Sequence, residues 1–276
     1  MKLRAHAKLN LSLRVFDKRP DGFHNLESVM QSVSLHDLVA LSSIPSGIEV
    51  TCDHPDVPKG RENLAYRAAE LFLSQVSGPR SQVNGCKVHI EKHIPMAAGL
   101  AGGSADAAAV LWGLNQIATS DLRLEPCDLL RLGAQVGSDV PFCLTGGTCL
   151  VSGRGEIVEK QQPWPKTYYV LVCPDIQVST KWAYEEFDRL HLNCPEQIKN
   201  DLEPVVVSRH GVITEIKEKL LKLGASEAQM SGSGPSVFGV FRHKTEADKA
   251  LDQIKEGYPR SFLVETVDSG LEIIDN

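Results

Sequence analysis

One run of small residues is the segment of this sequence best suited to chemistry. Residues 95–105 read PMAAGLAGGSA, and most of these positions hold Gly or Ala. Such small side chains leave backbone N–H groups uncovered, and where a loop of this kind enters a helix, the helix dipole adds to the attraction for an anion. We expect the phosphate groups of a nucleotide to bind at Pro95, Met96, Ala97, Ala98, Gly99, Leu100, Ala101, Gly102, Gly103, Ser104 and Ala105.

The flanks of this loop predict a strand before it and a helix after it. Residues 87–91 alternate polar and apolar side chains, as a half-buried strand does. Ser104 is expected to cap a helix over 105–115, with Asp106 in its first turn. The loop contains neither the Gly-Lys pair of a Walker A motif nor a Gly-x-Gly-x-x-Gly fingerprint, which argues against the two commonest nucleotide-binding folds. The alternative is a loop made of small residues only because the helix packs closely on a sheet.

Two further pairs of residues are placed where they could contact a ligand. Lys8 and Asn10 lie on one face of a predicted strand over 7–15. Phe23 and His24 follow the turn signal Arg-Pro-Asp-Gly, so an aromatic face and a hydrogen-bonding ring stand side by side. The simpler interpretations are a solvated lysine on a strand, a phenylalanine that packs in a turn and a surface histidine.

Two Gly- and Ser-containing turns complete the candidate groups. Asp139 lies in the sequence GSDVPF at 137–142, where its carboxylate could cap the next helical turn or act on a substrate. Gly232, Ser233 and Gly234 separate two short predicted strands. They form either a tight hairpin turn or a second set of backbone donors facing a ligand.

Composition narrows the classes of protein that remain. With 276 residues the chain is long enough for two domains, and its net charge of −6 with no basic stripe argues against a nucleic-acid partner. No stretch approaches the ~20 apolar residues of a membrane span, and no signal peptide is visible, so we expect a cytoplasmic protein, or one of a plastid-like stroma. An odd number of cysteines without Cys-x-x-Cys suggests that most are buried thiols: Cys52, Cys86, Cys127, Cys143, Cys149, Cys173 and Cys194.

The order of predicted elements changes after residue 162, which divides the chain into a first domain over 1–162 and a second over 163–276. The first holds the strand, loop and helix described above, further helices at 63–73 and 128–136, and a hairpin at 148–159. The second begins with a strand near 168–173, followed by helical elements through Lys222. Strands near 227–231 and 237–241, a helix at 244–254 and a final strand at 262–267 complete it. With an extra helical insertion, this order is βαββαβ, the split-βαβ arrangement.

Three motifs in this order resemble the GHMP small-molecule kinase superfamily: a lysine-bearing first strand, the loop Pro-x-x-x-Gly-Leu-x-Gly-Gly-Ser, and a C-terminal Gly-Ser-Gly-Pro. Segments 7–11, 19–24, 137–142 and 200–203 resemble one branch, which phosphorylates a cytidine diphosphate derivative in non-mevalonate isoprenoid synthesis. The resemblance implies an α+β fold with an N-terminal domain like the second domain of ribosomal protein S5 and a ferredoxin-like C-terminal domain. It places the active site between them, ATP over the small-residue loop, and Asn63 near the adenine.

The same resemblance implies roles for the candidate side chains. Asp139 is the base that takes the proton of the acceptor hydroxyl, and Lys8 is its cationic neighbour. A lysine within ~4–6 Å would keep that carboxylate ionised and could also reach a phosphate oxygen. Asn10, ~7 Å further along the strand, is expected to bind the substrate. Phe23 would stack on cytosine while His24 discriminates the base, and the turn at 232–234 would also face the substrate.

The expected partners are a small-molecule substrate and ATP, with no nucleic acid, no membrane, and a monomeric or weakly dimeric state. Mg²⁺ is expected with ATP, but we assign no metal ligand: Ser104 and Asp139 are both possible. Ala97, Ala98 and Ala101 stand where many relatives carry Gly, so a positive φ at any of them would be strained.

Three alternatives stay open at this point. One is another GHMP kinase, acting on homoserine, mevalonate or a sugar. Another is a non-catalytic ligand-binding or RNA-associated module on the same fold, against which Lys8 and Asp139 both argue. The third is an NAD-dependent oxidoreductase, which the missing dinucleotide fingerprint disfavours.

Overall fold

The computed structural model of the chain describes residues 1–76, 84–190 and 198–275. Its strands are β1 (Lys2–Asn10), β2 (Arg14–Lys18), β3 (His24–Ser43), β4 (Gly47–Cys52), β5 (Gly85–Glu91), β6 (Thr148–Ser152), β7 (Ile157–Lys160), β8 (Tyr168–Val172), β9 (Glu227–Met230), β10 (Val237–Phe241), β11 (Ser261–Glu265) and β12 (Leu271–Asp275). Its helices are α1 (Leu64–Val76), α2 (Gly102–Ile117), the short 3-10 helix η1 (Ser120–Leu122), α3 (Pro126–Val136), α4 (Val140–Thr145), α5 (Thr180–Leu190), α6 (Glu203–Arg209), α7 (Val212–Lys222) and α8 (Lys244–Lys255).

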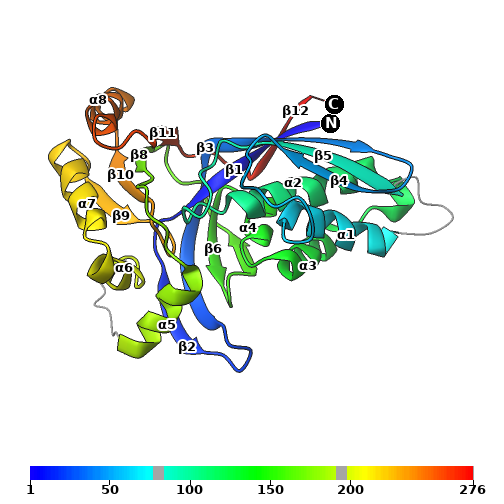
Figure 1. Cartoon of the computed structure of the whole chain (residues 1–276), viewed down its shortest axis with the longest axis horizontal. Coiled ribbons are helices and arrows are strands. Elements are labelled where there is room, and N and C mark those ends of the chain that lie inside the picture. The colour runs from blue at the N-terminus through cyan, green and yellow to red at the C-terminus, as the bar shows by residue number, and fades with distance from the viewer. Residues whose placement is uncertain (77–83, 191–197, 276) are drawn as a thin grey trace.

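A large sheet forms one half of the molecule (Figure 1). Its central order is β12-β1-β3-β5-β4, and β2, β6 and β7 extend it through β3. All of these pairs are antiparallel except β4 with β5. Helices α1 to α4 cover one face of this sheet (Figure 1), and the alternating burial along β5 shows that the other face of that strand meets solvent.

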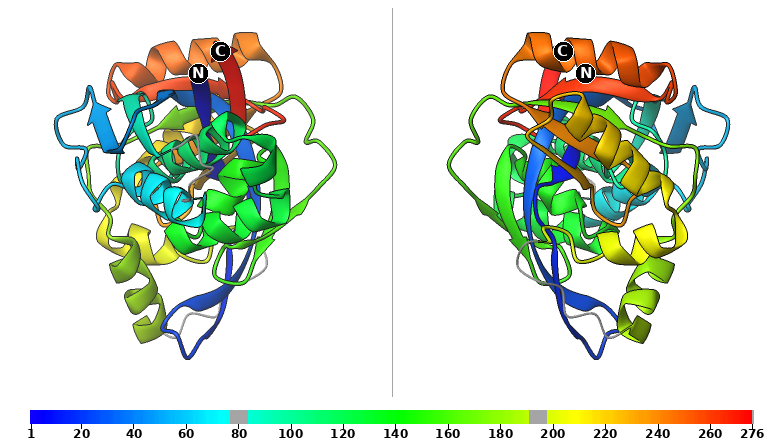
Figure 2. Two further views of the ribbon diagram at one scale, coloured as in Figure 1. Left: turned by 90° about the vertical axis from the view of Figure 1, so that its right-hand side faces the viewer. Right: turned by 90° about the vertical axis from the view of Figure 1, so that its left-hand side faces the viewer.

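A second, four-stranded sheet forms the other half, with the order β11-β8-β10-β9 and antiparallel pairing throughout. Helices α7 and α8 pack against it, as the two side views show (Figure 2). The element order from β8 to β11 is the predicted βαββαβ with an inserted helical stretch. The predicted two-part α+β fold, with its ferredoxin-like C-terminal half, is therefore confirmed.

The two halves exchange segments of the chain. Strand β12, which we did not predict, returns from the second half to pair with β1 at the edge of the large sheet, so that the two termini lie close together (Figure 1). In the opposite direction, Leu13 and Val15 belong to the apolar core of the second half. The division between residues 162 and 163 falls in the segment between β7 and β8, and it stays a prediction.

Two local expectations were wrong. The strand expected over 7–15 is interrupted, because β1 ends at Asn10 and β2 begins at Arg14. Helix α2 begins at Gly102, three residues before the expected start, and its N-cap is Ala101, which makes no side-chain cap hydrogen bond. Ser104 is therefore inside the first turn rather than the cap. The same shift of the helix start places Asp106 beyond the first turn, and its side chain is buried.

Two predictions from composition can be compared with the described part of the chain. None of its helices has the length and apolar character needed to cross a membrane. Among its cysteines, Cys86, Cys143, Cys149 and Cys173 are buried. Cys52 is half-buried and Cys127 is exposed, while Cys194 lies outside the described residues.

Candidate active site

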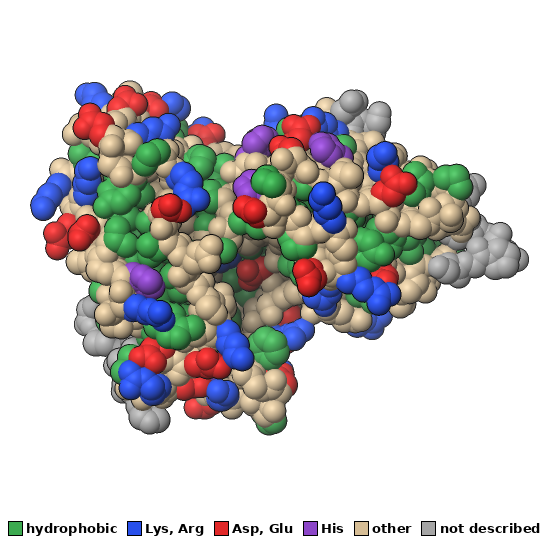
Figure 3. Space-filling model, in the orientation of Figure 1, with side chains coloured by type: hydrophobic (Ala, Val, Ile, Leu, Met, Phe, Trp, Pro, Cys, Tyr) green, Lys and Arg blue, Asp and Glu red, His purple; other side chains and the backbone are tan. Residues whose placement is uncertain are grey.

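A cavity of about 1020 Å³ lies between the two halves of the molecule, where the surface is deeply hollowed (Figure 3). It collects side chains from β1, the β2–β3 hairpin, the small-residue loop, the turn before α4, and α5. Among the residues that line it are the predicted Lys8, Asn10, Phe23, His24, Asn63, Asp139, Gly232, Ser233 and all positions from Pro95 to Ser104. The fold thus brings together groups that are far apart in the sequence.

Two predicted site residues do not line the cavity. Ala105 is fully buried and donates its backbone N–H to the carbonyl of Ala101 within α2, so its amide is already bonded. Gly234 is buried, and its N–H donates to the carbonyl of Ser231. Both residues support the backbone of their loops and do not line the cavity.

The small-residue loop contains left-handed backbone at three positions. Gly99 has φ 74°, which is typical of glycine, but Ala97 (φ 51°) and Ala101 (φ 57°) adopt the same region with a Cβ atom. Ala98 does not. The strain that we expected at positions where relatives carry Gly is therefore present at two of the three alanines.

The glycine-rich loops of the two halves pack backbone to backbone. A Cβ atom at Gly99 would lie 2.5 Å from the carbonyl oxygen of Ser231, so only glycine fits there. The Gly99 carbonyl also accepts hydrogen bonds from Lys8 Nζ at 2.8 Å and from Ser231 Oγ at 3.2 Å. Through these two hydrogen bonds the Gly99 carbonyl links the small-residue loop to β1 and to the turn at 231–234.

Lys8 is held inside this junction rather than on a solvated strand face. Its side chain is buried, and Nζ donates to Asn10 Oδ1 as well as to Gly99. Asn10 in turn donates from Nδ2 to Ser28 Oγ at 2.7 Å. Lys8 and Asn10 are two residues apart on β1, as expected, and their side chains also bond directly to each other. Burial lowers the pKa of Lys8 below its ordinary value, and the nearby Asp139 carboxylate opposes that shift.

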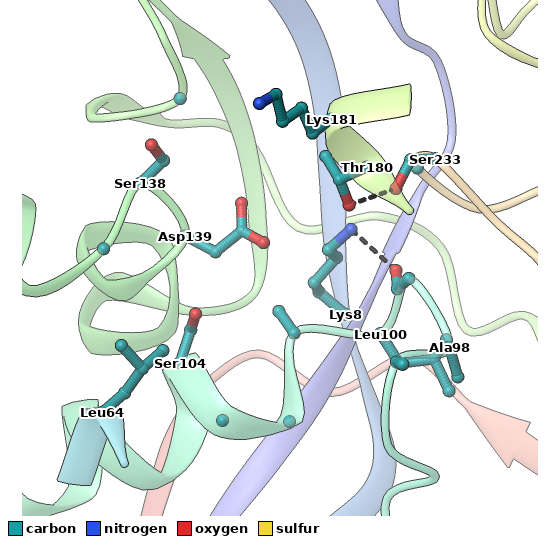
Figure 4. A pocket seen from close by; sticks show the side chains of 18 of the residues that line it. Lys8, Leu64, Ala98, Leu100, Ser104, Ser138, Asp139, Thr180, Lys181 and Ser233 are labelled. Carbon is teal, nitrogen blue, oxygen red and sulfur yellow. Dashed lines mark hydrogen bonds between the residues drawn. The ribbon is translucent and has the colours of Figure 1, made fainter. Parts of the chain in front are cut away.

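Asp139 occupies the N-cap position of α4, yet its side chain makes no cap hydrogen bond. In the described part of the chain, its carboxylate accepts no hydrogen bond and forms no ion pair. Figure 4 shows this carboxylate facing the same space as the Lys8 ammonium, with Ser104 and Ser138 nearby. The two charges influence each other across the cavity, although within the described residues they form no salt bridge.

Asn63 has a structural role that the sequence did not reveal. Its Oδ1 accepts the N–H of Ala65 at 2.8 Å, which caps α1, and its Nδ2 donates to Pro58 at 2.8 Å. Asn63 lines the cavity, but both of its polar side-chain atoms already have protein partners. It shapes this end of the cavity together with Val57 and Met96.

Aromatic groups gather at the β2–β3 hairpin. Phe23 is half exposed, and the Arg154 guanidinium lies 5.1 Å from its ring centroid. The His24 ring is buried and stacks on Tyr184, with centroids 5.2 Å apart and planes 23° apart. This end of the cavity therefore offers an open aromatic face beside a firmly held imidazole.

Helix α5 supplies cavity residues that our sequence reasoning missed, namely Thr180, Lys181 and Tyr184. Thr180 Oγ1 and Ser233 Oγ are 2.8 Å apart, and this contact ties the start of α5 to the glycine-rich turn (Figure 4). The sequence of α5 gave only a helical signal, because nothing in its spacing indicates which face meets the first half of the molecule.

A buried ionic cluster lies behind the start of α2. Lys92 Nζ donates to Asp106 at 2.7 Å and also to Asp37, and all three side chains are almost completely buried. A Cβ atom at Gly102 would lie 3.0 Å from Lys92 Nζ, so the ammonium is directly below the loop. Burial raises the pKa of Asp106 to about 8; Lys92 opposes this rise and Asp37 adds to it.

No group of three or more potential metal-binding side chains occurs within residues 1–76, 84–190 and 198–275. Mg²⁺ that accompanies a nucleotide needs only one or two protein ligands, because phosphate oxygens and water complete its octahedral shell. The Asp139 carboxylate and the Ser104 hydroxyl both line the cavity and suit that role.

Comparisons with known proteins agree with this architecture. Residues 63–147 match the family described as GHMP kinases N terminal domain, and residues 181–260 match GHMP kinases C terminal. A 4-diphosphocytidyl-2-C-methyl-D-erythritol kinase of Acetivibrio thermocellus is 42% identical, over 96% of this chain and 98% of its own length. One from Clostridium botulinum is 40% identical, over 97% of this chain and 100% of its own.

Solved structures give the same result. A 4-(cytidine 5'-diphospho)-2C-methyl-D-erythritol kinase has a TM-score of 0.81 and 30% identity, covering 96% of this chain and 99% of that chain. A homoserine kinase from Cytophaga hutchinsonii shares the fold, with a TM-score of 0.72, 21% identity, and coverage of 99% and 97%. The chain is an ATP-dependent small-molecule kinase and belongs to the 4-diphosphocytidyl-2-C-methyl-D-erythritol kinase family of the GHMP kinase superfamily.

Proposed function

We propose that this kinase transfers the γ-phosphoryl group of ATP to the 2-hydroxyl of 4-diphosphocytidyl-2-C-methyl-D-erythritol. The single observation that carries the proposal is the arrangement of one cavity. Its walls hold Lys8, the unpartnered Asp139 carboxylate and the small-residue loop, while Phe23 and His24 lie at the β2–β3 hairpin. The names of the relatives support this choice of substrate.

The small-residue loop is suited to hold the triphosphate. Its Ala and Gly side chains leave the backbone accessible, and α2 begins at Gly102 with no side-chain cap on its first N–H groups. Free N–H groups at the start of a long helix, together with the helix dipole, bind phosphate oxygens. In phosphoryl transfer such positioning supplies most of the catalysis, because the transition state is loose and needs little covalent help.

In this proposal Asp139 accepts the proton of the attacking hydroxyl. A carboxylate without a protein partner has free lone pairs for that proton, and its place opposite Lys8 leaves room for a hydroxyl between the two groups (Figure 4). The Lys8 ammonium, fixed by Asn10 and Gly99, stabilises negative charge on the attacking oxygen and on the transferred group.

The β2–β3 hairpin would bind the nucleoside end of the acceptor. Phe23 offers a half-exposed ring for stacking, and His24 offers a hydrogen-bonding ring beside it. Stacking tolerates any base, so discrimination requires the hydrogen bonds. Mg²⁺ would be held by phosphate oxygens with Asp139 or Ser104, where it would supply neutralisation of phosphate charge.

A substrate comparison tests the proposal. An assay coupled to ADP release should show turnover with 4-diphosphocytidyl-2-C-methyl-D-erythritol and only background rates with mevalonate, homoserine or galactose. Comparable rates on one of the other three alcohols would mean that the chain is a different GHMP kinase and that the hairpin does not select cytidine.

A substitution tests the proposed base. Asp139→Asn should lower kcat by about 10²–10⁴-fold, the usual contribution of a positioned base, while the nucleotide still binds. Asp128→Asn is the matched control, because Asp128 is a partly exposed acid on α3 that forms an ion pair with Arg131. Retention of full kcat in Asp139→Asn would assign this carboxylate a structural role instead.

A further inference from the structure

Helix α5 holds the His24 ring in two ways. Tyr184 and Asp188 are four residues apart, which places them on the same face of the helix. Tyr184 stacks on the face of the imidazole, and Asp188 Oδ1 lies 2.6 Å from Nε2. The ring is only 5% exposed, so the second half of the molecule fixes both its plane and one of its edges.

The Asp188 carboxylate has a second partner. Its Oδ2 accepts a hydrogen bond from Lys18 Nζ at 2.7 Å. Although burial alone would raise its pKa, the hydrogen bonds from Lys18 and His24 hold the pKa of Asp188 below the ordinary value. Asp188 is therefore an ionised carboxylate at neutral pH. Because such a group can only accept hydrogen bonds, the proton between it and His24 belongs to Nε2.

This contact determines what the other ring nitrogen can do. When Nε2 of a neutral imidazole carries the proton, Nδ1 is an acceptor. Within the described residues, His24 Nδ1 has no hydrogen-bond partner, and His24 lines the cavity. With the ring neutral, Nδ1 of His24 therefore presents an acceptor whose complement is an N–H or O–H donor.

We propose that Asp188 is a positioning residue that holds His24 as an acceptor for a hydrogen-bond donor on the nucleoside half of the acceptor substrate. The inference rests on the proposed function, which places a cytidine at this hairpin. Cytidine offers two kinds of donor, the exocyclic amine of the base and the ribose hydroxyls. Uridine carries a carbonyl oxygen in place of the exocyclic amine. That oxygen is an acceptor and would face the acceptor Nδ1 without a proton between them.

Asp188→Asn is the sharpest test, because it keeps the size of the side chain and leaves one oxygen for two partners. Lys18 can only donate, so it claims that oxygen and turns the introduced NH₂ group toward His24. Nε2 then becomes the acceptor and Nδ1 carries the proton. Nitrogen NMR shifts of the histidine ring should report this exchange of tautomers in the full-length protein.

The kinetic consequence is specific. Asp188→Asn should raise KM for the cytidyl substrate about tenfold, the value of one hydrogen bond, with little change in kcat or in KM for ATP. Adding Lys18→Met to Asp188→Asn frees the amide oxygen to turn back to Nε2, so this double variant should regain the original tautomer and much of the affinity. Glu186→Gln is the control, since Glu186 lies on the same helix and pairs with Arg189.

Two analogues identify the donor. If it is the base amine, the wild-type kinase should discriminate against the uridyl analogue, and Asp188→Asn should narrow that preference. If it is a ribose hydroxyl, the 2'-deoxycytidyl analogue should show the same pattern instead.

An unchanged tautomer and unchanged KM in Asp188→Asn would overturn the inference and leave the proposed function intact. Failure of the wild-type protein to use any cytidyl substrate, with the Nε2–H tautomer present, would refute the proposed function and with it the assignment of a nucleoside to His24.

Discussion

Replacing Ala97 by Gly should stabilise this kinase, although glycine substitutions usually destabilise proteins. Ala97 is exposed and has φ 51°, a left-handed conformation that its Cβ atom makes unfavourable. Its neighbour Ala98 is 5% exposed and lies outside that region. Adjacent positions in one loop therefore form a matched pair in which the same substitution should have opposite effects.

The expected sizes follow from these two environments. A left-handed conformation costs an L-residue about 1–2 kcal/mol, which Ala97→Gly would release. The greater freedom of glycine in the unfolded chain takes back about 0.4–1 kcal/mol. The net gain is about 0.5–1 kcal/mol, since the exposed methyl group of Ala97 contributes no burial. Ala98→Gly has the same unfolded-state cost and also loses a buried methyl worth about 0.8 kcal/mol, so it should destabilise by about 1–2 kcal/mol.

Thermal unfolding of the two variants beside wild type measures this difference. In a chain of this size class, Tm shifts by about 2–4 °C for each kcal/mol of stability. The Tm of Ala97→Gly should therefore lie above that of wild type and the Tm of Ala98→Gly below it, about 5 °C apart. Unfolding in urea gives an independent midpoint for each variant. Equal destabilisation by Ala97→Gly and Ala98→Gly would show that the positive φ at Ala97 stores no strain, and the reasoning would fail.

Three other perturbations have defined outcomes. The pKa of Asp106 is raised to about 8 in the folded state, so its contribution to stability is complete at acid pH and declines as pH rises toward 8. Urea midpoints of wild type, measured from about pH 6 to about pH 9, should show this decline. In Asp106→Asn the midpoints should change less over the same range. Phe23→Ala should raise KM for the cytidyl substrate about 10–100-fold through lost stacking, whereas Phe23→Tyr should stay near wild type in the same ADP-release assay. Gly232→Ala would bring a methyl group within 3.0 Å of Asn10 Oδ1 and 3.2 Å of Lys8 Nζ at a φ of +59°, so kcat should fall at least tenfold, and an unaffected kcat would show that the exact position of Lys8 matters little.

Much of the fold could be predicted from local sequence. The alternation over residues 87–91 corresponds to β5, and the helical spacing over 128–136 lies within α3. Strand β10 was predicted with its observed bounds. These elements are determined by side chains a few positions apart, which a single sequence displays directly.

The start of α2 shows where this reasoning stopped. Sequence rules look for a capping side chain and chose Ser104, but the helix begins with a left-handed Ala101 whose conformation depends on its surroundings. Asp106 was expected in the first turn, and the sequence did not reveal its burial because its partners, Lys92 and Asp37, come from other segments. Strand β12 was missed because its five residues are a weak local signal, and its place is determined by the edge of β1, with which it pairs.

The amino-acid sequence by itself determined a donor-rich loop between a strand and a helix, and a set of polar side chains on separate short motifs. The tertiary structure alone decided which of them meet. Lys8 contacts Gly99, 91 positions away, and His24 contacts Asp188, 164 positions away. Local preferences act between near neighbours in the chain, whereas contacts over such separations exist only after both halves have buried their apolar cores and closed the cavity between them.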